Sequence, residues 1–323
     1  MFPIVRKRRL RRNQAVRDLV AESRLLPSDL IYPLFVCDQR GARIPVPSMP
    51  GIYQQSPDNA LIEAGQLLAK GVNTFLLFGI PQEKDQEATS AWFEDGIIQR
   101  TARAFRKQFG DEVVLIADTC LCEYMTHGHC GVYLDGRVLN DPTLELLART
   151  AVSQAEAGVD MVAPSDMMDG RVIHIRDSLD EAGFQDTAIL SYAVKYNSSL
   201  YGPFREAADS TPGSGDRRGY QMDYRNAREA LDEASLDVEE GADILLVKPA
   251  TGYQDILVRL RERCNLPLFA YSVSGEYAMI KAAAEKGWLN EQDVVLEQLY
   301  GLKRAGADRI ITYHAPLAAD WLK

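Results

Sequence analysis

Eight short apolar runs recur along the 323-residue chain, and they limit its fold more than any other feature. The runs are continuously apolar and do not alternate with polar residues, which is typical of parallel strands covered on both faces. Stretches with helical periodicity separate most of the runs, so the chain predicts an alternating α/β fold. The runs lie at residues 30–36, 73–79, 113–119, 161–165, 188–195, 243–248, 266–273 and 309–314.

One helix-to-strand joint is repeated four times and supports this interpretation. Each copy precedes a predicted strand and holds a glycine, which favours the left-handed conformation that ends many helices. The copies are KGVN at 70–73, AGVD at 157–160, EGAD at 240–243 and AGAD at 305–308.

A predicted helix before the second joint has recognisable ends. Asp141 is expected to cap its N-terminus, with Pro142 at the first helical position, and Gly158 to end it. One apolar face is expected, formed by Leu144, Leu147, Ala151 and Ala155.

Eight strands with such joints predict a (β/α)8 TIM barrel over residues 29–323, preceded by an extended N-terminal arm over residues 1–28. The length alone hints at two domains, but α/β barrels of this size form one. A doubly wound open sheet is the alternative. No apolar run reaches the roughly 18 residues of a membrane span, and no signal peptide is recognised, so we expect a cytoplasmic protein without a membrane partner.

The arm is strongly basic although the chain carries a net charge of −10. Residues 6–12, RKRRLRR, hold six basic side chains and no acid. One interpretation is contact with nucleic acid. We favour docking on an acidic surface of the same protein or of another subunit, because no aromatic or glycine-rich RNA-binding signature accompanies the arm.

Three of the five cysteines lie close together in the sequence, at Cys120, Cys122 and Cys130. Clustered cysteines in an intracellular protein indicate metal ligands before disulfides, and soft sulfur ligands select zinc. Three thiolates leave a fourth position for water or substrate, which is the pattern of a catalytic site. His127 or His129 could instead complete a structural site, and free thiols without a metal or a disulfide remain alternatives.

Two lysines, Lys195 and Lys248, end apolar strands, and Asp118, Ser165 and Tyr313 stand at other strand ends. Active sites of this barrel lie at the carboxyl ends of the strands, so we expect these side chains to converge. Burial and a neighbouring cation lower the pKa of an amine and make it nucleophilic. Such lysines form Schiff bases with ketones and aldehydes.

Five segments carry a family resemblance, in order, over nearly the whole chain. They are DTCLCEYMTHGHCG from residue 118, APSDMMDG from 163, KYNSSLYGPFREAA from 195, LLVKPA from 245 and SVSGEYAM from 272. These segments resemble porphobilinogen synthase, the 5-aminolevulinate dehydratase family, in its zinc-type bacterial form. The resemblance implies a (β/α)8 lyase of tetrapyrrole (haem) biosynthesis that condenses two 5-aminolevulinate molecules into porphobilinogen and releases two waters.

The resemblance also implies catalytic roles for individual residues. Lys248 would form the Schiff base with the molecule that becomes the propionate side, and Lys195 would bind the second molecule. Asp118 is the candidate proton shuttle, with Ser165 beside it. The three cysteines match the ligands of a catalytic zinc ion, which polarises a carbonyl group as a Lewis acid.

The family match further implies partners for the two substrate carboxylates. Guanidinium groups suit this task because their fork binds both oxygens. Ser274 and Tyr313 would hold one carboxylate, and Arg205, Arg217 and Gln221 the other. The segment at about 197–222, which holds these arginines, is expected to form an active-site lid.

Three weaker implications concern metal, assembly and pH. Glu233 matches the acid of a remote, allosteric magnesium site, although its acidic surroundings equally suit a solvated helix face. The basic arm matches one that wraps a neighbouring barrel in a homo-octamer. His314, where the family commonly has an aromatic residue, is expected to affect the pH profile.

Two competing functions remain at this point. A class I aldolase would explain one lysine but would leave the second lysine and the cysteines unused. A non-catalytic zinc-binding or nucleic-acid-binding protein would require the lysines at the strand ends to be accidental.

Overall fold

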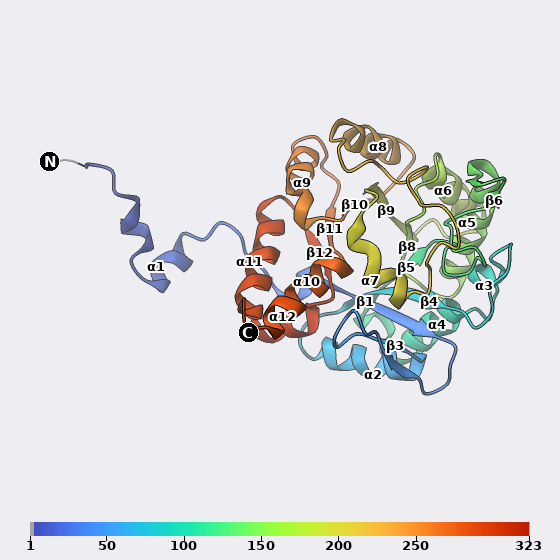
Figure 1. Ribbon diagram of the computed structural model, residues 1–323, viewed down its shortest axis with the longest axis horizontal. Coiled ribbons are helices and arrows are strands. Elements are labelled where there is room, and N and C mark those ends of the chain that lie inside the picture. The colour runs from blue at the N-terminus through green and yellow to red at the C-terminus, as the bar shows by residue number, and fades with distance from the viewer. Residues whose placement is uncertain (1–2, 323) are drawn as a thin grey trace.

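The computed structural model describes residues 3–322, and its centre is a closed barrel of eight parallel strands (Figure 1). The last strand pairs with the first through Leu30 with Ile310 and Ile31 with Ile311. This closure confirms the predicted TIM barrel and shows that the open-sheet alternative was wrong. The strands are β1 (Leu30–Cys37), β4 (Thr74–Ile80), β5 (Val114–Thr119), β8 (Met161–Pro164), β9 (Ala188–Lys195), β10 (Ile244–Lys248), β11 (Leu268–Ser272) and β12 (Arg309–Thr312).

Helices surround the barrel and cover the outer faces of its strands (Figure 1). Both faces of the strands are therefore buried, which explains their continuously apolar sequences. The α-helices are α1 (Gln14–Leu19), α2 (Pro57–Leu68), α3 (Thr89–Trp92), α4 (Ile97–Phe109), α5 (Asn140–Glu156), α6 (Arg171–Glu181), α7 (Gly202–Ala207), α8 (Arg228–Glu239), α9 (Gln254–Arg261), α10 (Ser274–Glu285), α11 (Glu291–Arg304) and α12 (Ala315–Trp321). The 3-10 helices are η1 (Lys7–Arg11), η2 (Pro27–Asp29), η3 (Gly110–Glu112), η4 (Ser199–Tyr201) and η5 (Thr251–Tyr253).

The four repeated joints have the predicted backbone conformation. Gly71, Gly158, Gly241 and Gly306 have φ values of +89°, +93°, +100° and +110°. A side chain is strained in this region, so glycine ends each helix and allows the chain to turn directly into the next strand.

The acid that ends three of these joints has a structural role that the sequence did not reveal. The carboxylate of Asp160 accepts the backbone N–H of Leu115 at 2.7 Å, on the neighbouring strand. Asp243 and Asp308 do the same for the strands before theirs, at 2.8 Å each. These bonds join neighbouring strands at the amino-terminal end of the barrel, opposite the expected active site.

Helix α5 differs from the prediction at its start. It begins at Asn140 with Leu139 as the N-cap residue, so Asp141 lies in the first turn and does not cap the helix. An acid in that turn still interacts favourably with the helix dipole. Its predicted face is buried at Leu147, Ala151 and Ala155, and half-buried at Leu144.

Two short antiparallel pairs were not predicted. Strands β2 (Arg43–Pro45) and β3 (Tyr53–Gln55) pair with each other, and β3 extends the sheet beside β1. Strands β6 (Tyr133–Leu134) and β7 (Arg137–Val138) form a hairpin after the cysteine-rich loop. Runs of two or three residues are too short for a periodic signal.

The N-terminal segment extends away from the barrel (Figure 1). Neither η1 nor α1 has a buried residue, and the apolar side chains of Ile4, Val5 and Leu19 are at least 72% exposed. Neither η1 nor α1 therefore contributes to the core of this barrel, whereas Leu25, near the end of the predicted arm, is buried in that core. Within the described residues, no helix is long and apolar enough to cross a membrane.

Candidate active site

The two lysines stand side by side at the carboxyl ends of adjacent strands. Lys195 ends β9 and Lys248 ends β10, and their Cα atoms are partners in the strand register. Their side chains are only 5% and 4% exposed. The Lys195 ammonium group donates a hydrogen bond to the main-chain carbonyl of Ser165, at the end of β8. The predicted convergence of these strand ends is therefore present in the fold.

Strand β9 contains a bulge just before its lysine. Ser191 pairs with Leu245 and Val194 pairs with Val247, so two residues of β9 lie opposite one residue of β10. A bulge re-aims the side chains that follow it. Here it brings Tyr192 and Lys195 to the same interior face although they are three positions apart, and the Lys195 nitrogen lies 5.6 Å from the Tyr192 ring centroid.

Aromatic rings surround the Lys248 nitrogen, and sequence reasoning missed them. Their contribution is a dry, apolar environment in which an uncharged amine is favoured. Burial and the nearby Lys195 cation together lower the pKa of Lys248 to about 7. The ring centroids lie at 4.4 Å for Tyr271, 4.8 Å for Phe204, 5.1 Å for Tyr192, 5.5 Å for Tyr201 and 6.0 Å for Phe78.

The lowered pKa predicts how the reactivity of Lys248 depends on pH. Below about pH 7 the amine is protonated and cannot attack a carbonyl, and above it the nucleophilic form dominates. We therefore expect the labelling rate of Lys248 by a small amine reagent to rise through pH 7, measured by mass spectrometry of the labelled peptide. Exposed Lys107 provides the comparison within the same protein. A Lys248 rate that rises only near pH 10, as for an ordinary lysine, would contradict the prediction.

Asp118, at the end of β5, has an environment suited to proton transfer. Burial and repulsion from Glu123 raise the pKa of Asp118 to about 7. One carboxylate oxygen accepts a 3.1 Å hydrogen bond from the Ser165 hydroxyl, and the other has no hydrogen-bond partner among the described residues. A carboxyl group with a pKa near neutrality can both take and return a proton during turnover.

The three clustered cysteines meet in the loop after β5. Cys120, Cys122 and Cys130 are free and at most 3% exposed, and their sulfur atoms all lie within 4.8 Å of one another. The Cys120 and Cys122 sulfurs are 3.5 Å apart, close to the ~3.8 Å between two thiolates on a tetrahedral zinc ion. Hydrogen bonds from the other two thiols lower the pKa of Cys130 well below its usual value. The residues present therefore fit a thiolate-bound metal ion.

The two neighbouring histidines have other partners. The Nε2 atom of His129 lies 2.9 Å from the Ser214 carbonyl, so it donates, and its Nδ1 atom accepts from the Tyr220 hydroxyl at 3.1 Å. His127 accepts the backbone N–H of His129 through Nδ1 at 3.1 Å. Neither histidine belongs to a compact group of metal-ligating side chains in the described part of the chain. This arrangement favours three protein ligands over four.

The segment over residues 197–222 contacts the loop after β5 and the start of α10, and it carries buried polar groups. Arg217 is 4% exposed and donates to the carbonyls of Gly128 and Ser210, at 2.9 and 2.7 Å. Gln221 is 3% exposed, and both polar atoms of its side chain lack a partner among the residues described. Buried polar atoms without partners are rare and mark a place where a ligand can bind. Arg205 is half-buried, and burial and the Arg217 charge lower its pKa.

Ser274 and Tyr313 follow the ends of strands β11 and β12, and both are buried. The Tyr313 hydroxyl is 3.0 Å from that of Tyr271, which already stands against Lys248. The Ser274 hydroxyl accepts the backbone N–H of Phe204 at 3.0 Å and donates to the Leu200 carbonyl at 3.1 Å. Ser274 therefore contacts the segment over residues 197–222 through both of its hydrogen bonds.

The relation of the chain to known proteins agrees with this geometry. The family model for delta-aminolevulinic acid dehydratase matches residues 4–321. The chain belongs to this family. A delta-aminolevulinic acid dehydratase of Synechococcus elongatus is 57% identical over 326 residues, and one of Bacillus subtilis is 55% identical over 317, with at least 98% of each chain covered. The chain is therefore a dehydratase, which is a hydro-lyase, and the aldolase and non-catalytic alternatives are set aside.

A solved structure extends the match to three dimensions. It is the delta-aminolevulinic acid dehydratase of Toxoplasma gondii in complex with the reaction product porphobilinogen. It shares 49% sequence identity with a TM-score of 0.97, over 99% of this chain and 92% of that one. The dehydratase fold is thus reproduced over essentially the whole barrel.

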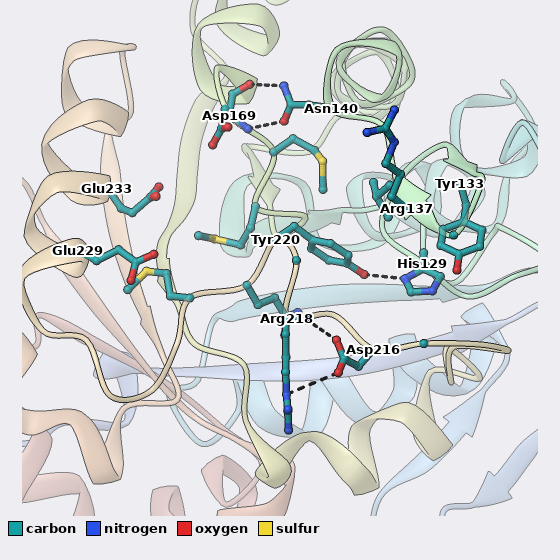
Figure 2. Close-up of a pocket in the computed structure, with 18 residues that line it drawn as sticks. His129, Tyr133, Arg137, Asn140, Asp169, Asp216, Arg218, Tyr220, Glu229 and Glu233 are labelled. Carbon is teal, nitrogen blue, oxygen red and sulfur yellow. Dashed lines mark hydrogen bonds and ion pairs between the residues drawn. The ribbon is translucent and has the colours of Figure 1, made fainter.

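His314 and Glu233, the two remaining residues singled out in the sequence, are not part of the lysine and cysteine site. Burial and the Lys281 charge lower the pKa of His314 to about 3, so its ring is uncharged near neutral pH. The lowered pKa argues against an effect of His314 near neutral pH, and its effect on the pH profile stays a prediction. Glu233 lies on α8, away from the lysines, beside a cavity of about 690 Å³ that the lid segment also lines (Figure 2).

Proposed function

We propose that the protein condenses two 5-aminolevulinate molecules into porphobilinogen with release of two waters. The observation that carries this proposal is the pair of buried lysines, in register on adjacent strands, beside three clustered thiols. A ketone substrate needs an uncharged amine, and Lys248 has one near neutral pH. The family match and the product bound to the Toxoplasma relative support the same reaction.

The residues suggest how the bonds are exchanged. The Lys248 amine attacks the keto carbon of one substrate, and loss of its oxygen as water leaves an imine. Asp118 lies within the same buried site and can supply the proton that this oxygen needs and later accept one. Lys195 holds the second substrate in the same way, so each ketone oxygen leaves as one of the two waters. Attack of the first substrate's amine on the second imine forms the carbon–nitrogen bond and expels the Lys195 amine. Attack of the second substrate's α-carbon on the first imine, with loss of a proton from that carbon, forms the carbon–carbon bond, and elimination then frees the Lys248 amine.

The two substrate carboxylates would be bound by two different sets of residues. We assign one to Ser274 and Tyr313, through neutral hydrogen bonds, and the other to Arg205, Arg217 and Gln221. The unpartnered side-chain amide of Gln221 and the unpartnered Nε atom of Arg217 support the second assignment. Residues 197–222 would act as a lid that closes over both molecules and excludes water.

A zinc ion is the cofactor that the cysteines suit best. Cys120, Cys122 and Cys130 would hold it, because three buried soft ligands at this spacing match its tetrahedral preference. Bound zinc would supply Lewis acidity beside the second substrate. The free thiols and the absence of a candidate membrane span in the described residues are compatible with a cytoplasmic protein.

The direct test is to incubate the purified protein with 5-aminolevulinate and assay the pyrrole product with and without a zinc chelator. We expect product that disappears on chelation and returns when zinc is added. Product that survives complete zinc removal would keep the reaction but reject an essential metal. No product under any metal condition would reject the proposed reaction.

A second, allosteric metal is proposed at Glu233. This carboxylate is half-buried, and burial raises its pKa, while Glu229 and Asp169 line the same cavity (Figure 2). Magnesium keeps several waters and needs only one or two carboxylates from the protein. An acid at the edge of a roomy, polar cavity meets that requirement without a compact cluster of ligands.

The basic arm is proposed to dock on another subunit in a homo-octamer. Among the described residues, no hydrogen bond or ion pair joins the basic side chains of residues 6–12 to the barrel. Several apolar side chains of the arm are exposed, and the rest of the chain is acidic. Deleting residues 1–12 should lower the molecular mass measured by light scattering and reduce activity at low protein concentration. An unchanged mass and activity would contradict docking, and loss of nucleic-acid binding alone would favour the other interpretation of the arm.

A further inference from the structure

Arg171, in the first turn of α6, is a fully buried charged side chain outside the proposed chemistry. It is 2% exposed and forms a two-pronged pair with Asp237 of α8, at 3.2 and 3.0 Å. Asp237 is equally buried. A buried ion pair is costly to desolvate and often adds little net stability, so its presence calls for a positional explanation.

The pair binds the bulge in β9 directly. Arg171 donates to the Ser191 hydroxyl at 3.2 Å and to the Tyr192 carbonyl at 3.4 Å. The Ser191 hydroxyl in turn donates to the Asp237 carboxylate. A bulge leaves some backbone groups outside the regular ladder of hydrogen bonds between strands. Here Arg171 binds one such group, the Tyr192 carbonyl, together with the neighbouring Ser191 side chain. The bulge is the feature that brings Lys195 to the interior face.

The same guanidinium also binds the loop between β8 and α6. It donates to the Met168 carbonyl at 3.2 Å, and its Nε atom lies 4.0 Å from the Asp166 carboxylate. The residue before Asp166 is Ser165, whose carbonyl accepts the hydrogen bond from Lys195. Arg171 thus contacts both segments whose separation determines where the Lys195 nitrogen lies.

We propose that the Arg171–Asp237 pair is a positioning device for Lys195. It fixes the β9 bulge relative to the β8–α6 loop, and so holds the Lys195 amine at the place where the second substrate binds. The functional role of the pair rests on the proposed lysine chemistry. Its effect on the position of the Lys195 amine does not depend on the substrate. The planar fork of arginine is needed, because a lysine cannot bind Asp237 with two parallel bonds while reaching the other acceptors.

Lys248 offers an internal control for this idea. It ends β10, and no hydrogen bond of Arg171 or Asp237 in the described structure reaches that strand. A general loss of stability would affect both lysines. Loss of positioning should affect Lys195 far more than Lys248, because four of the five rings around the Lys248 nitrogen lie outside β9.

The test compares the double variant Arg171→Met/Asp237→Leu with Arg171→Lys and the wild type. The double variant replaces the pair by apolar side chains of similar volume, a change that buried ion pairs often tolerate without loss of stability. Thermal unfolding first establishes which variants are folded. Each protein is then labelled with formaldehyde and cyanoborohydride without substrate, and separately trapped with 5-aminolevulinate and borohydride. Peptide mass spectrometry measures both reactions at each lysine.

We expect the folded variants to lose about 10- to 100-fold in the rate of labelling and trapping at Lys195, with less than about twofold change at Lys248. Equal losses at both lysines, or none at Lys195, would overturn the proposal. If neither lysine of the wild type is trapped by 5-aminolevulinate, the proposed reaction fails, while the formaldehyde rates still decide the positioning question. If the double variant does not fold, the decision rests on Arg171→Lys, which keeps the charge.

Discussion

Replacing Lys248 by methionine is expected to lower kcat/KM for porphobilinogen formation by on the order of 10⁴-fold or more, the scale of removing a covalent nucleophile. Methionine keeps the length and most of the apolar contact with the surrounding aromatic rings, so the barrel should remain folded. The variant should also lose the borohydride-trapped 5-aminolevulinate adduct that the wild type forms at this position. Steady-state assay and mass spectrometry of the trapped protein measure the two effects.

The matched control is Lys107→Met, at an exposed position on α4. It removes the same charge far from the site and should retain wild-type activity and the Lys248 adduct. A Lys248→Met enzyme with more than a tenth of wild-type activity would show that the amine is not the nucleophile, provided that its thermal unfolding matches the wild type.

The second large effect is expected for Cys122→Ala. Loss of one of three ligands should release the zinc ion, measured by elemental analysis of the purified protein, and lower activity by about 100-fold or more. The two remaining thiols cannot close the tetrahedral site. Zinc content and activity should fall together, and excess zinc should restore them only partly.

Cys264→Ala is the control for this second prediction, because Cys264 is half-buried and lies outside the cluster. It should keep both its zinc and its activity. A Cys122→Ala protein with full zinc content and full activity would contradict the catalytic-metal proposal, and one that kept zinc but lost activity would point to a role of this thiol in the reaction itself.

The barrel could be predicted from the sequence because two strong local signals coincide. Continuous apolar runs identify strands that are buried on both faces, and Gly71, Gly158, Gly241 and Gly306 mark where helices end. Register is different, because it depends on which side chains oppose one another across two strands. The bulge opposite Leu246 therefore could not be predicted from the sequence of β9 alone. For the same reason, the short β2–β3 pair could not be predicted from the sequence of either strand.

The candidate site was predictable to the extent that its residues end strands. Lys195, Lys248 and Asp118 follow apolar runs directly, so the barrel rule places them together. The aromatic surroundings of Lys248 come from five separate elements, and only the folded chain brings them together. Phe78, at the end of a predicted strand, was the one ring that the same rule could have found.

The buried pair of Arg171 and Asp237 was missed for a different reason. Charged residues on helices are usually solvated, and composition gives no signal of the exceptions. One indication was available, since Arg171 directly follows a conspicuous motif, APSDMMDG, that carries Ser165. A charged residue beside a strand-end motif is therefore a reasonable place to look for groups that act through the backbone.

The two ends of the proposed lid, residues 197–222, are attached to the end of strand β9. Met222 donates its backbone N–H to the Lys195 carbonyl at 3.1 Å, and Asn197 donates to the Met222 carbonyl at 2.8 Å. A movement that opens the lid from this end must stretch the bonds that fix the backbone of Lys195. The open state would then admit a substrate while the Lys195 amine is displaced, and the closed state would hold the amine in position. On the proposed function, an open enzyme would hold the Lys195 amine out of place, so aldehydes and ketones that enter before the substrate pair is enclosed would not react with it.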